Sequence, residues 1–372
     1  MRFLEELKNL DYFLFLVILL IQVFGVIAVY SATYNGGISP FVYKHLIYIG
    51  IGWFLIFLLS FEKLENILDL SLYIYLFNLF LLILVLVAGK EVYGSKRWLS
   101  LGFINIQPSE FMKISLILIT AYLLPLIKGI KDRRLALLLL VYAIPSVITL
   151  KQPDLGTTVA YFVPLFFMLL VRGVPLRYFV LFGFILLSLT PVLWKYFLKP
   201  YQKKRILAVI DPMSDYYGSG YQLIQSKIAI GSGMLTGKGL LKGTQTHLMF
   251  LPEKHTDFIF AVIGEEFGFI GTFTLSVLFL LLFLRLIYYH EIFQRSYEKL
   301  FVAGVYSLIL FQFTVNTLMT MGLFPVVGIP LPFVSVGGSS MISFSIAIGL
   351  LQNVYKKYKN PYMRLDKEPV YE

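Results

Sequence analysis

The stretch DYFLFLVILLIQVFGVIAVYS, residues 11–31, carries a single charged side chain, that of Asp11 at its first position. A helix needs about 20 mostly apolar residues to cross the hydrocarbon core of a bilayer. In lipid, the backbone polar groups must bond within the segment, and an α-helix satisfies them all. The stretch therefore predicts a membrane-spanning helix. It is too long for the apolar part of a cleavable signal peptide, and no small-residue cleavage site follows it.

Nine further apolar runs follow along the chain, separated by polar segments that are mostly short. The sequence therefore predicts an all-α polytopic membrane protein with ten transmembrane helices, built as a single domain over residues 1–372. The nine runs are residues 42–61, 70–88, 109–127, 134–150, 155–171, 177–194, 258–289, 300–323 and 333–354.

The composition agrees with a lipid environment. Of the 372 residues, 58% are hydrophobic and 14% are charged, whereas soluble domains carry about 25% charged residues. The net charge of +11 does not indicate nucleic-acid binding, because no basic and aromatic module accompanies it and much of the Lys and Arg lies in loops beside apolar runs. The absence of cysteine excludes disulfides, thiolate catalysis and cysteine-ligated metals.

The distribution of basic residues predicts the orientation. If the N-terminus is cytoplasmic, the inner segments hold 17 Lys and Arg residues and the short outer segments hold 5. Because basic residues accumulate in short cytoplasmic loops, both termini are expected inside. The inner set is Arg2, Lys8, Lys63, Lys128, Lys131, Arg133, Arg134, Arg172, Arg177, Arg285, Arg295, Lys299, Lys356, Lys357, Lys359, Arg364 and Lys367, and the outer set is Lys44, Lys90, Lys96, Arg97 and Lys151.

Residues 195–256 form one long polar segment between the seventh and eighth runs, which this orientation places outside the cytoplasm. Loops of this length in compact proteins are usually functional. Within it, QLIQSKIAI at 222–230 has apolar and polar faces at helical spacing and is expected to form an interfacial helix. The glycines of 231–239 do not match a Walker phosphate loop. Residues 356–372 are expected to form a cytoplasmic tail.

The stretch PEKHTDFIF, residues 252–260, ends this segment and opens the eighth run. Asp257 would stand at the start of a helix, where it serves either as an N-cap or as a catalytic carboxylate above the lipid surface. The residues leave both interpretations open. His255 alone is more often structural. Glu265 and Glu266 follow about two turns deeper, and at least one of them should face the bundle interior.

Four more polar clusters are predicted on the same side. Glu110 and Lys113 share a helix face at spacing i, i+3, and either form a packing ion pair or line a polar cavity for a charged headgroup. Arg97 could bind a phosphate and Trp98 could stack on a sugar or anchor at the interface. Asp154, in a tight turn, could simply cap the next helix. The fourth cluster is the broken backbone of residues 328–340, which contains Ser335.

These residues together resemble the SEDS family, the membrane glycosyltransferases of peptidoglycan synthesis. The resemblance covers essentially the whole chain and is carried by five stretches in order. Within the family, GKGLLKGTQ at 237–245 and Lys254 resemble the elongation branch rather than the division branch, although Leu240 and Met234 depart from its usual Trp and Gly. The five stretches are residues 97–98, 107–113, 152–157, 252–260 and 330–339.

The resemblance implies an inverting glycosyl transfer that polymerises lipid II, with undecaprenyl pyrophosphate as the leaving group. Asp257 matches the family's essential aspartate and is therefore predicted to be catalytic. No metal ligand is predicted, and a divalent cation such as Mg²⁺ bound by the lipid pyrophosphate is left open. The predicted substrate-binding residues are Arg97, Trp98, Glu110, Lys113, Asp154, Lys242, His255, Thr256 and Ser335.

The resemblance further implies a class B penicillin-binding protein as partner, a multi-pass location in the cytoplasmic (inner) membrane and an active site on its extracytoplasmic face. Two alternatives remain: a lipid II flippase, and a non-catalytic scaffold for the penicillin-binding protein. A flippase should carry ionisable groups or broken helices near the bilayer midplane, whereas the clusters here gather on one side. Concentrated charge at one face argues against a scaffold.

Overall fold

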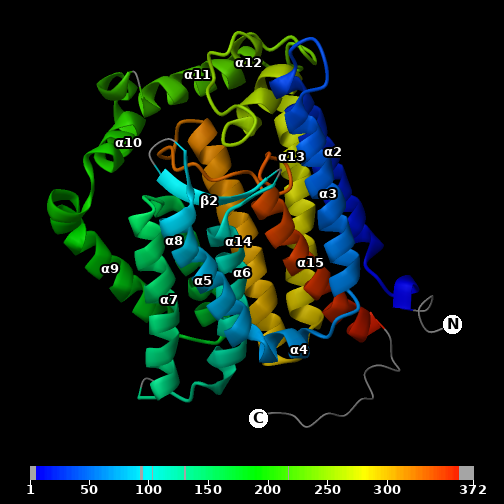
Figure 1. Ribbon diagram of the computed structural model, residues 1–372, viewed down its shortest axis with the longest axis vertical. Helices are drawn as coiled ribbons and strands as arrows, with labels where there is room; N and C mark the ends of the chain where they lie inside the picture. Colours follow the sequence, from blue (N-terminus) through cyan, green and yellow to red (C-terminus); the bar gives the residue numbers. More distant parts are fainter. Residues whose placement is uncertain (1–5, 93–94, 103, 130, 217, 360–372) are drawn as a thin grey trace.

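The computed structural model describes residues 6–92, 95–102, 104–129, 131–216 and 218–359. It shows a bundle of long helices, with the first and last described residues at one end of the bundle and a small sheet and several short helices toward the other (Figure 1). We call the end that holds the sheet and the short helices, within residues 90–106 and 200–247, the hairpin end. The part of the predicted tail beyond residue 359 lies outside the described residues.

Every one of the ten predicted apolar runs is helical over most of its length. Eight described helices are long and apolar enough to cross a membrane, with α6 and α9 counted together with their continuations η1 and η2. Of the other two runs, α8 has 17 residues, and α15 carries three lysines in its last turn. The helices are α2 (Tyr12–Thr33), α3 (Pro40–Leu59), α5 (Ser71–Ala88), α6 (Pro108–Leu123), η1 (Leu124–Leu126), α7 (Arg133–Lys151), α8 (Leu155–Val171), α9 (Leu176–Val192), η2 (Leu193–Phe197), α13 (Ile259–Ile292), α14 (Ser296–Thr320) and α15 (Gly338–Lys359).

Polar residues and prolines set several helix starts. The Asp11 carboxylate accepts hydrogen bonds from the N–H groups of Phe13 and Leu14, which caps α2. Asp154 caps α8 in the same way, and Pro108 occupies the first turn of α6, where no N–H is needed.

Two predicted runs are corrected by the structure. The tenth helix begins at Gly338 rather than at residue 333, because the chain first makes a turn in which Ser335 Oγ accepts a hydrogen bond from the N–H of Leu331 at 2.8 Å. The eighth run is not one regular helix: Gly268 has φ +61° inside α13. The N–H groups of Phe269 and Ile270 bond to the carbonyls of residues 234 and 235 instead, so the long segment takes over the broken helical bonds.

The hairpin end holds structure that the hydrophobic pattern did not predict. Three antiparallel strands, in the order β1-β2-β3, occupy the link between α5 and α6. The long segment is mostly helical, and its helix α11 contains the stretch 222–230 that was predicted to be helical. The elements are β1 (Lys90–Val92), β2 (Ser95–Leu101), β3 (Ile104–Ile106), α10 (Pro200–Ile210), η3 (Pro212–Asp215), α11 (Ser219–Ser232) and α12 (Thr244–His247).

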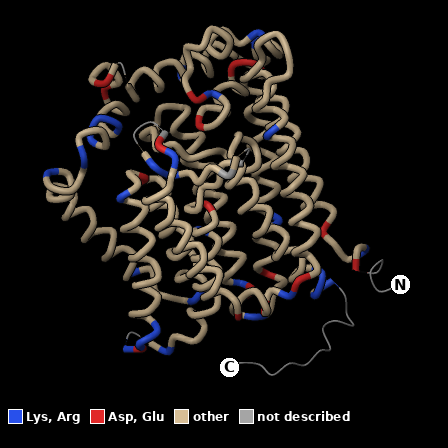
Figure 2. Tube along the Cα trace, in the orientation of Figure 1, with Lys and Arg blue, Asp and Glu red and all other residues tan. Residues whose placement is uncertain are grey.

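Charged residues cluster toward the two ends of the bundle and are sparse between them (Figure 2). At the end near the termini, Arg285 pairs with Asp11 at 2.5 Å, while Glu65 of α4 (Leu64–Asp69) pairs with Arg295 at 3.0 Å and Lys357 at 2.9 Å. In contrast with the packed bundle, α9 has no buried residue and stands to one side (Figure 1). The helix α9 is therefore only loosely joined to the core.

Candidate active site

The segment that carries Asp257 is clamped to the turn before α15. The N–H of Val336 donates to the carbonyl of His255 at 3.0 Å, and Ser335 Oγ donates to the carbonyl of Thr256 at 2.6 Å. The His255 ring also lies 4.5 Å from the ring of Phe41, centre to centre. Four of the predicted site residues, His255, Thr256, Asp257 and Ser335, are thus brought together.

The backbone of Asp257 is fixed while its carboxylate stays unpaired. Asn316 of α14 donates one side-chain amide to the carbonyl oxygens of both Asp257, at 2.9 Å, and Ile329, at 2.8 Å. The part-buried carboxylate has no hydrogen-bond partner among the described residues. Burial, reinforced by the charge of Glu253, raises the pKa of Asp257 to about 7, although Arg205 and Arg97 act in the opposite direction. A carboxyl group with such a pKa is suited to take up a proton near neutral pH.

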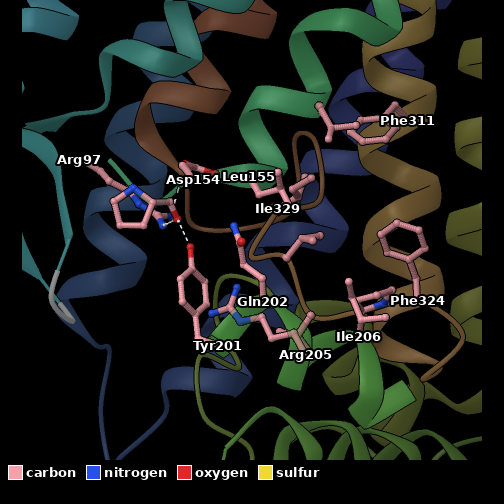
Figure 3. A pocket seen from close by; sticks show the side chains of 16 residues that line it. Arg97, Asp154, Leu155, Tyr201, Gln202, Arg205, Ile206, Phe311, Phe324 and Ile329 are labelled. Atoms are coloured by element: carbon pink, nitrogen blue, oxygen red, sulfur yellow. Dashed lines mark hydrogen bonds and ion pairs between the residues drawn. The ribbon is translucent and has the colours of Figure 1, made fainter. Parts of the chain in front are cut away.

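A cavity of about 190 Å³ (Figure 3) lies near Asp257, although Asp257 is not one of the residues that line it. Its wall includes residues 324–327 and Ile329. Gly328 lies between them in the chain, and Asp257 Oδ2 lies 3.3 Å from the point where a Cβ on Gly328 would stand. We call this space the guanidinium pocket, after the two arginines in its wall. It is lined by Arg97, Pro153, Asp154, Leu155, Gly156, Val159, Tyr201, Gln202, Arg205, Ile206, Phe311, Phe324, Pro325, Val326, Val327 and Ile329.

Arg97 and Asp154 form a fixed part of this wall. Arg97 pairs with Asp154 at 3.3 Å and donates to the carbonyls of Gln152 at 3.0 Å and Pro153 at 2.5 Å. Asp154 in turn accepts from the N–H and hydroxyl of Thr157, so it does cap a helix. Of the five N–H groups of Arg97, two donate hydrogen bonds and a third faces Asp154 in the ion pair, so two have no partner among the described residues and can bind a ligand.

Arg205 of α10 is a guanidinium that the sequence analysis missed. It lies 5.7 Å from the ring of Tyr201, and no acceptor bonds it within the described residues. Both side chains point into the pocket from the opposite side to Arg97 (Figure 3). The basic run at 203–205, inside a long segment predicted to be functional, was the available signal.

Trp98 lines a different space from its neighbour Arg97. Successive side chains of a strand point to opposite faces, and Arg97 and Trp98 are adjacent in β2. Trp98 borders a second cavity, which lies on the other side of the turn at Pro330. The structure thus separates two residues that the sequence had placed together.

Glu110, in the first turn of α6, and Lys113, in the second, form a buried ion pair. Their charged atoms are 2.6 Å apart, and the residues are 3% and 2% exposed. The second carboxylate oxygen of Glu110 has no partner among the described residues. The shared face is as predicted, but the pair makes no contact with Asp257, and its role in substrate binding stays a prediction.

Lys242 is not brought to Asp257. It is exposed, and its segment, residues 233–247, folds against Glu265 and Glu266. Both glutamates face the interior: Glu266 accepts from Ser31 at 2.5 Å and lies 3.3 Å from His247 Nε2.

Glu265 holds this segment at several points. Its carboxylate accepts from Lys238 Nζ at 2.7 Å, from the N–H of Gln245 at 2.8 Å, and from the N–H and hydroxyl of Thr246 at 3.1 and 2.8 Å. The residue is completely buried. We infer that Glu265 fixes the shape of the 238–246 loop.

We predict that Glu265→Ala loosens this loop without unfolding the bundle, because buried N–H groups lose a charged acceptor worth about 1–3 kcal/mol each. Hydrogen exchange of the 238–246 amides should accelerate at least tenfold. Glu291→Ala, which removes an exposed glutamate, should leave that exchange unchanged. Equal protection in both variants would refute the role given to Glu265.

The described residues offer no group of three or more His, Asp or Glu side chains placed to hold a metal ion.

The fold and the site define a polytopic helical membrane protein with an unpaired carboxylate beside a guanidinium-lined pocket at one end of its bundle. A family model described as cell cycle protein, covering FtsW, RodA and SpoVE, matches residues 11–360. The chain belongs to this family, the SEDS proteins.

Several relatives and solved structures are similar to the chain. It is 38% identical to peptidoglycan glycosyltransferase MrdB of Escherichia coli K12 over 292 residues, 77% of this chain and 78% of that protein. It is 41% identical over 286 residues to the probable peptidoglycan glycosyltransferase FtsW of Thiomicrospira cyclica, 75% and 73% of the two chains.

Among solved structures, RodA of Thermus thermophilus aligns over 94% of this chain and 97% of its own, with TM-score 0.70 and 29% identity. A chain from work on the structural coordination of polymerization and crosslinking by a peptidoglycan synthase complex aligns over 94% and 98%, with TM-score 0.81 and 31% identity.

Proposed function

We propose that this chain is a SEDS peptidoglycan glycosyltransferase that polymerises lipid II into glycan strands in cell elongation. The observation that carries the proposal is the part-buried carboxylate of Asp257, which has no hydrogen-bond partner among the described residues and is influenced by the charge of Arg205, a guanidinium that also has no acceptor there. Relatives of this family are named as peptidoglycan glycosyltransferases, and the likeness includes RodA. A base and an anion-binding group side by side are the two elements that such a transfer requires.

In the proposed reaction, the 4-hydroxyl of the acceptor sugar attacks C1 of the donor sugar. The new C–O bond forms as the bond from C1 to the pyrophosphate oxygen breaks, with inversion at C1, and the hydroxyl proton passes to a carboxylate oxygen of Asp257. The electron pair leaves on the lipid pyrophosphate. Arg205 and the two free N–H groups of Arg97 are placed to bind that growing negative charge.

The pKa of Asp257 predicts the pH dependence of polymerisation. A general base acts in its deprotonated form, so the rate should rise with pH, reach half its maximum near pH 7, and level off above it. Because the charge of Glu253 raises that pKa, Glu253→Gln should move the profile to lower pH. Initial rates of polymerisation of labelled lipid II over a pH series test this. A profile that is flat through neutral pH in both proteins would exclude Asp257 as the base.

We further propose the membrane arrangement and the assembly of this single domain. Ten helices cross the inner membrane with both termini in the cytoplasm, which makes the hairpin end extracytoplasmic, as the distribution of Lys and Arg favours. The partner is a class B penicillin-binding protein that cross-links the new strand. The similarity to a chain of a complex that coordinates polymerization with crosslinking supports this partner.

The chain contains no cysteine, so labelling of single introduced cysteines can measure the proposed orientation with no signal from native thiols of this protein. Ile210→Cys, at a position that is 81% exposed at the hairpin end, should react with a membrane-impermeant maleimide in intact spheroplasts. Lys131→Cys, exposed at the opposite end, should react only after permeabilisation. The reverse pattern would show that the active site faces the cytoplasm.

A further inference from the structure

The second cavity, which Trp98 borders, contains the beginning of α15. It has about the same volume as the guanidinium pocket, about 190 Å³, but a more polar wall. None of the described residues that line it carries a carboxylate. We call it the α15 pocket. Its lining residues are Phe41, Lys44, Tyr48, Trp98, Asn105, Gln107, Pro330, Val336, Gly337, Gly338, Ser339 and Ser340.

The N-terminus of α15 presents backbone donors to this pocket. The first N–H groups of a helix have no partner within it and carry the positive end of its dipole. Gly337, which precedes the helix, has no side chain to cap them, and the N–H groups of Gly338, Ser339 and Ser340 have no acceptor among the described residues. Such a helix end binds anions.

Two side chains of the pocket, a hydroxyl in the first turn of α15 and an ammonium from α3, add to this positive end. Ser340 is only 5% exposed, lines the pocket, and its hydroxyl has no hydrogen-bond partner in the described part of the chain. A buried hydroxyl without a partner is costly, so its presence in a pocket wall points to a ligand. Lys44 of α3 is exposed at the same pocket and forms no ion pair with a described residue.

The rest of the wall suits a sugar. Trp98 offers an aromatic face, and Asn105 and Gln107 offer amides that can donate and accept. The pocket is held rigidly, because Ser339 Oγ accepts from the N–H of Gln107 at 2.8 Å and a Cβ at Gly338 would lie 2.3 Å from the ring of Tyr48. An anion site next to polar and aromatic groups fits a phosphate-linked sugar.

We propose that the α15 pocket binds the pyrophosphate and adjoining sugar of the acceptor lipid, while the guanidinium pocket binds those of the donor; this rests on the proposed function. Consecutive residues Ile329 and Pro330 line the two pockets, so the turn that clamps Asp257 separates them. The donor pyrophosphate leaves from the reacting carbon and must lie beside Asp257, as Arg205 does. The acceptor pyrophosphate is a disaccharide away from the attacking hydroxyl, and its site must stand apart from Asp257.

The test counts lipid II molecules bound to the inactive Asp257→Asn chain, purified whole in nanodiscs and titrated with fluorescent lipid II. We expect two sites, one of which weakens about tenfold when Lys44→Gln is added, as the loss of a charge-assisted contact implies. Lys151→Gln, which removes an exposed lysine outside both pockets, should leave both sites intact. Ser340→Ala should weaken the same site as Lys44→Gln. Two unaltered sites in the Lys44→Gln chain would overturn the proposal.

Two further arms separate this proposal from the proposed function and from simple phosphate binding. In active chains, Lys44→Gln should raise KM for lipid II about tenfold and change kcat less than twofold. The measured number of bound lipid II molecules does not depend on catalysis, so it reports on the α15 pocket even if the chain forms no polymer. Inorganic pyrophosphate and undecaprenyl pyrophosphate serve as sugar-free competitors. If Lys44→Gln weakens only their binding and leaves that of lipid II unchanged, the pocket is a plain phosphate site and the proposal fails.

Discussion

Asp257→Asn is expected to abolish glycan polymerisation by the purified chain, with a loss of at least about 10²-fold, because the amide cannot accept the acceptor proton. The loss should fall on kcat. The fold should survive, since the carboxylate makes no hydrogen bond to the described residues. The Asp257 carbonyl is held by Asn316, and the two preceding carbonyls are held by Val336 and Ser335. Labelled lipid II, separated by gel after a timed reaction, measures the loss.

The matched control for this variant is Asp69→Asn, the same chemical change at an exposed position of α4. It should retain full activity. Both variants should show the same unfolding temperature in detergent as the parent chain. Polymer of normal length and amount from Asp257→Asn would remove Asp257 from the reaction, although it would leave the family assignment intact.

The buried pair of α6 should give the largest loss of stability. Glu110→Gln leaves the Lys113 ammonium buried without its partner at 2.6 Å, which typically costs about 3–5 kcal/mol. Replacing both residues, as Glu110→Gln with Lys113→Met, should recover much of that loss, because no unpaired charge remains. Thermal unfolding in detergent, followed by loss of the monodisperse peak, measures the effect.

For comparison, Arg134→Gln breaks an exposed ion pair with Asp132, at 3.9 Å, and should cost less than about 1 kcal/mol. The activity of the stable double variant then tests whether the pair also contributes to a polar cavity that binds a charged headgroup. If the double variant is as active as the parent, Glu110 and Lys113 serve packing. A single Glu110→Gln variant as stable as the parent would contradict the buried geometry itself.

The positions of the long helices could be predicted because each depends only on a local run of apolar residues that is long enough to span the bilayer. The start of α15 and the break at Gly268 could not, since both result from contacts between distant segments. Ser335 Oγ makes the turn that delays α15, and residues 234 and 235 take over the hydrogen bonds that α13 gives up. The strands β1 to β3 have only 3, 7 and 3 residues, so the apolar alternation at residues 99–101 and 104–106 was too short to predict them.

The candidate site was predictable where chemistry and family likeness coincide in one stretch, as at Asp257. Its surroundings were not, because they come from separate parts of the chain. Arg205 enters from α10, and Asn316, which holds the backbone of Asp257, lies within α14. A polar residue in an apolar helix was a usable signal for Asn316. Nothing local distinguished the free guanidinium of Arg205 from that of Arg97, three of whose N–H groups bond within the protein.

The most direct measurement is the fate of labelled lipid II in proteoliposomes that contain the purified wild-type chain and its cognate penicillin-binding protein, inactivated for transpeptidation. Polymer length and transbilayer movement of the lipid are followed in the same sample. We predict long glycan strands, formed from lipid II in the leaflet that faces the hairpin end. Transbilayer movement without polymer, with the partner bound, would contradict the polymerase and favour transport; neither activity would favour a scaffold.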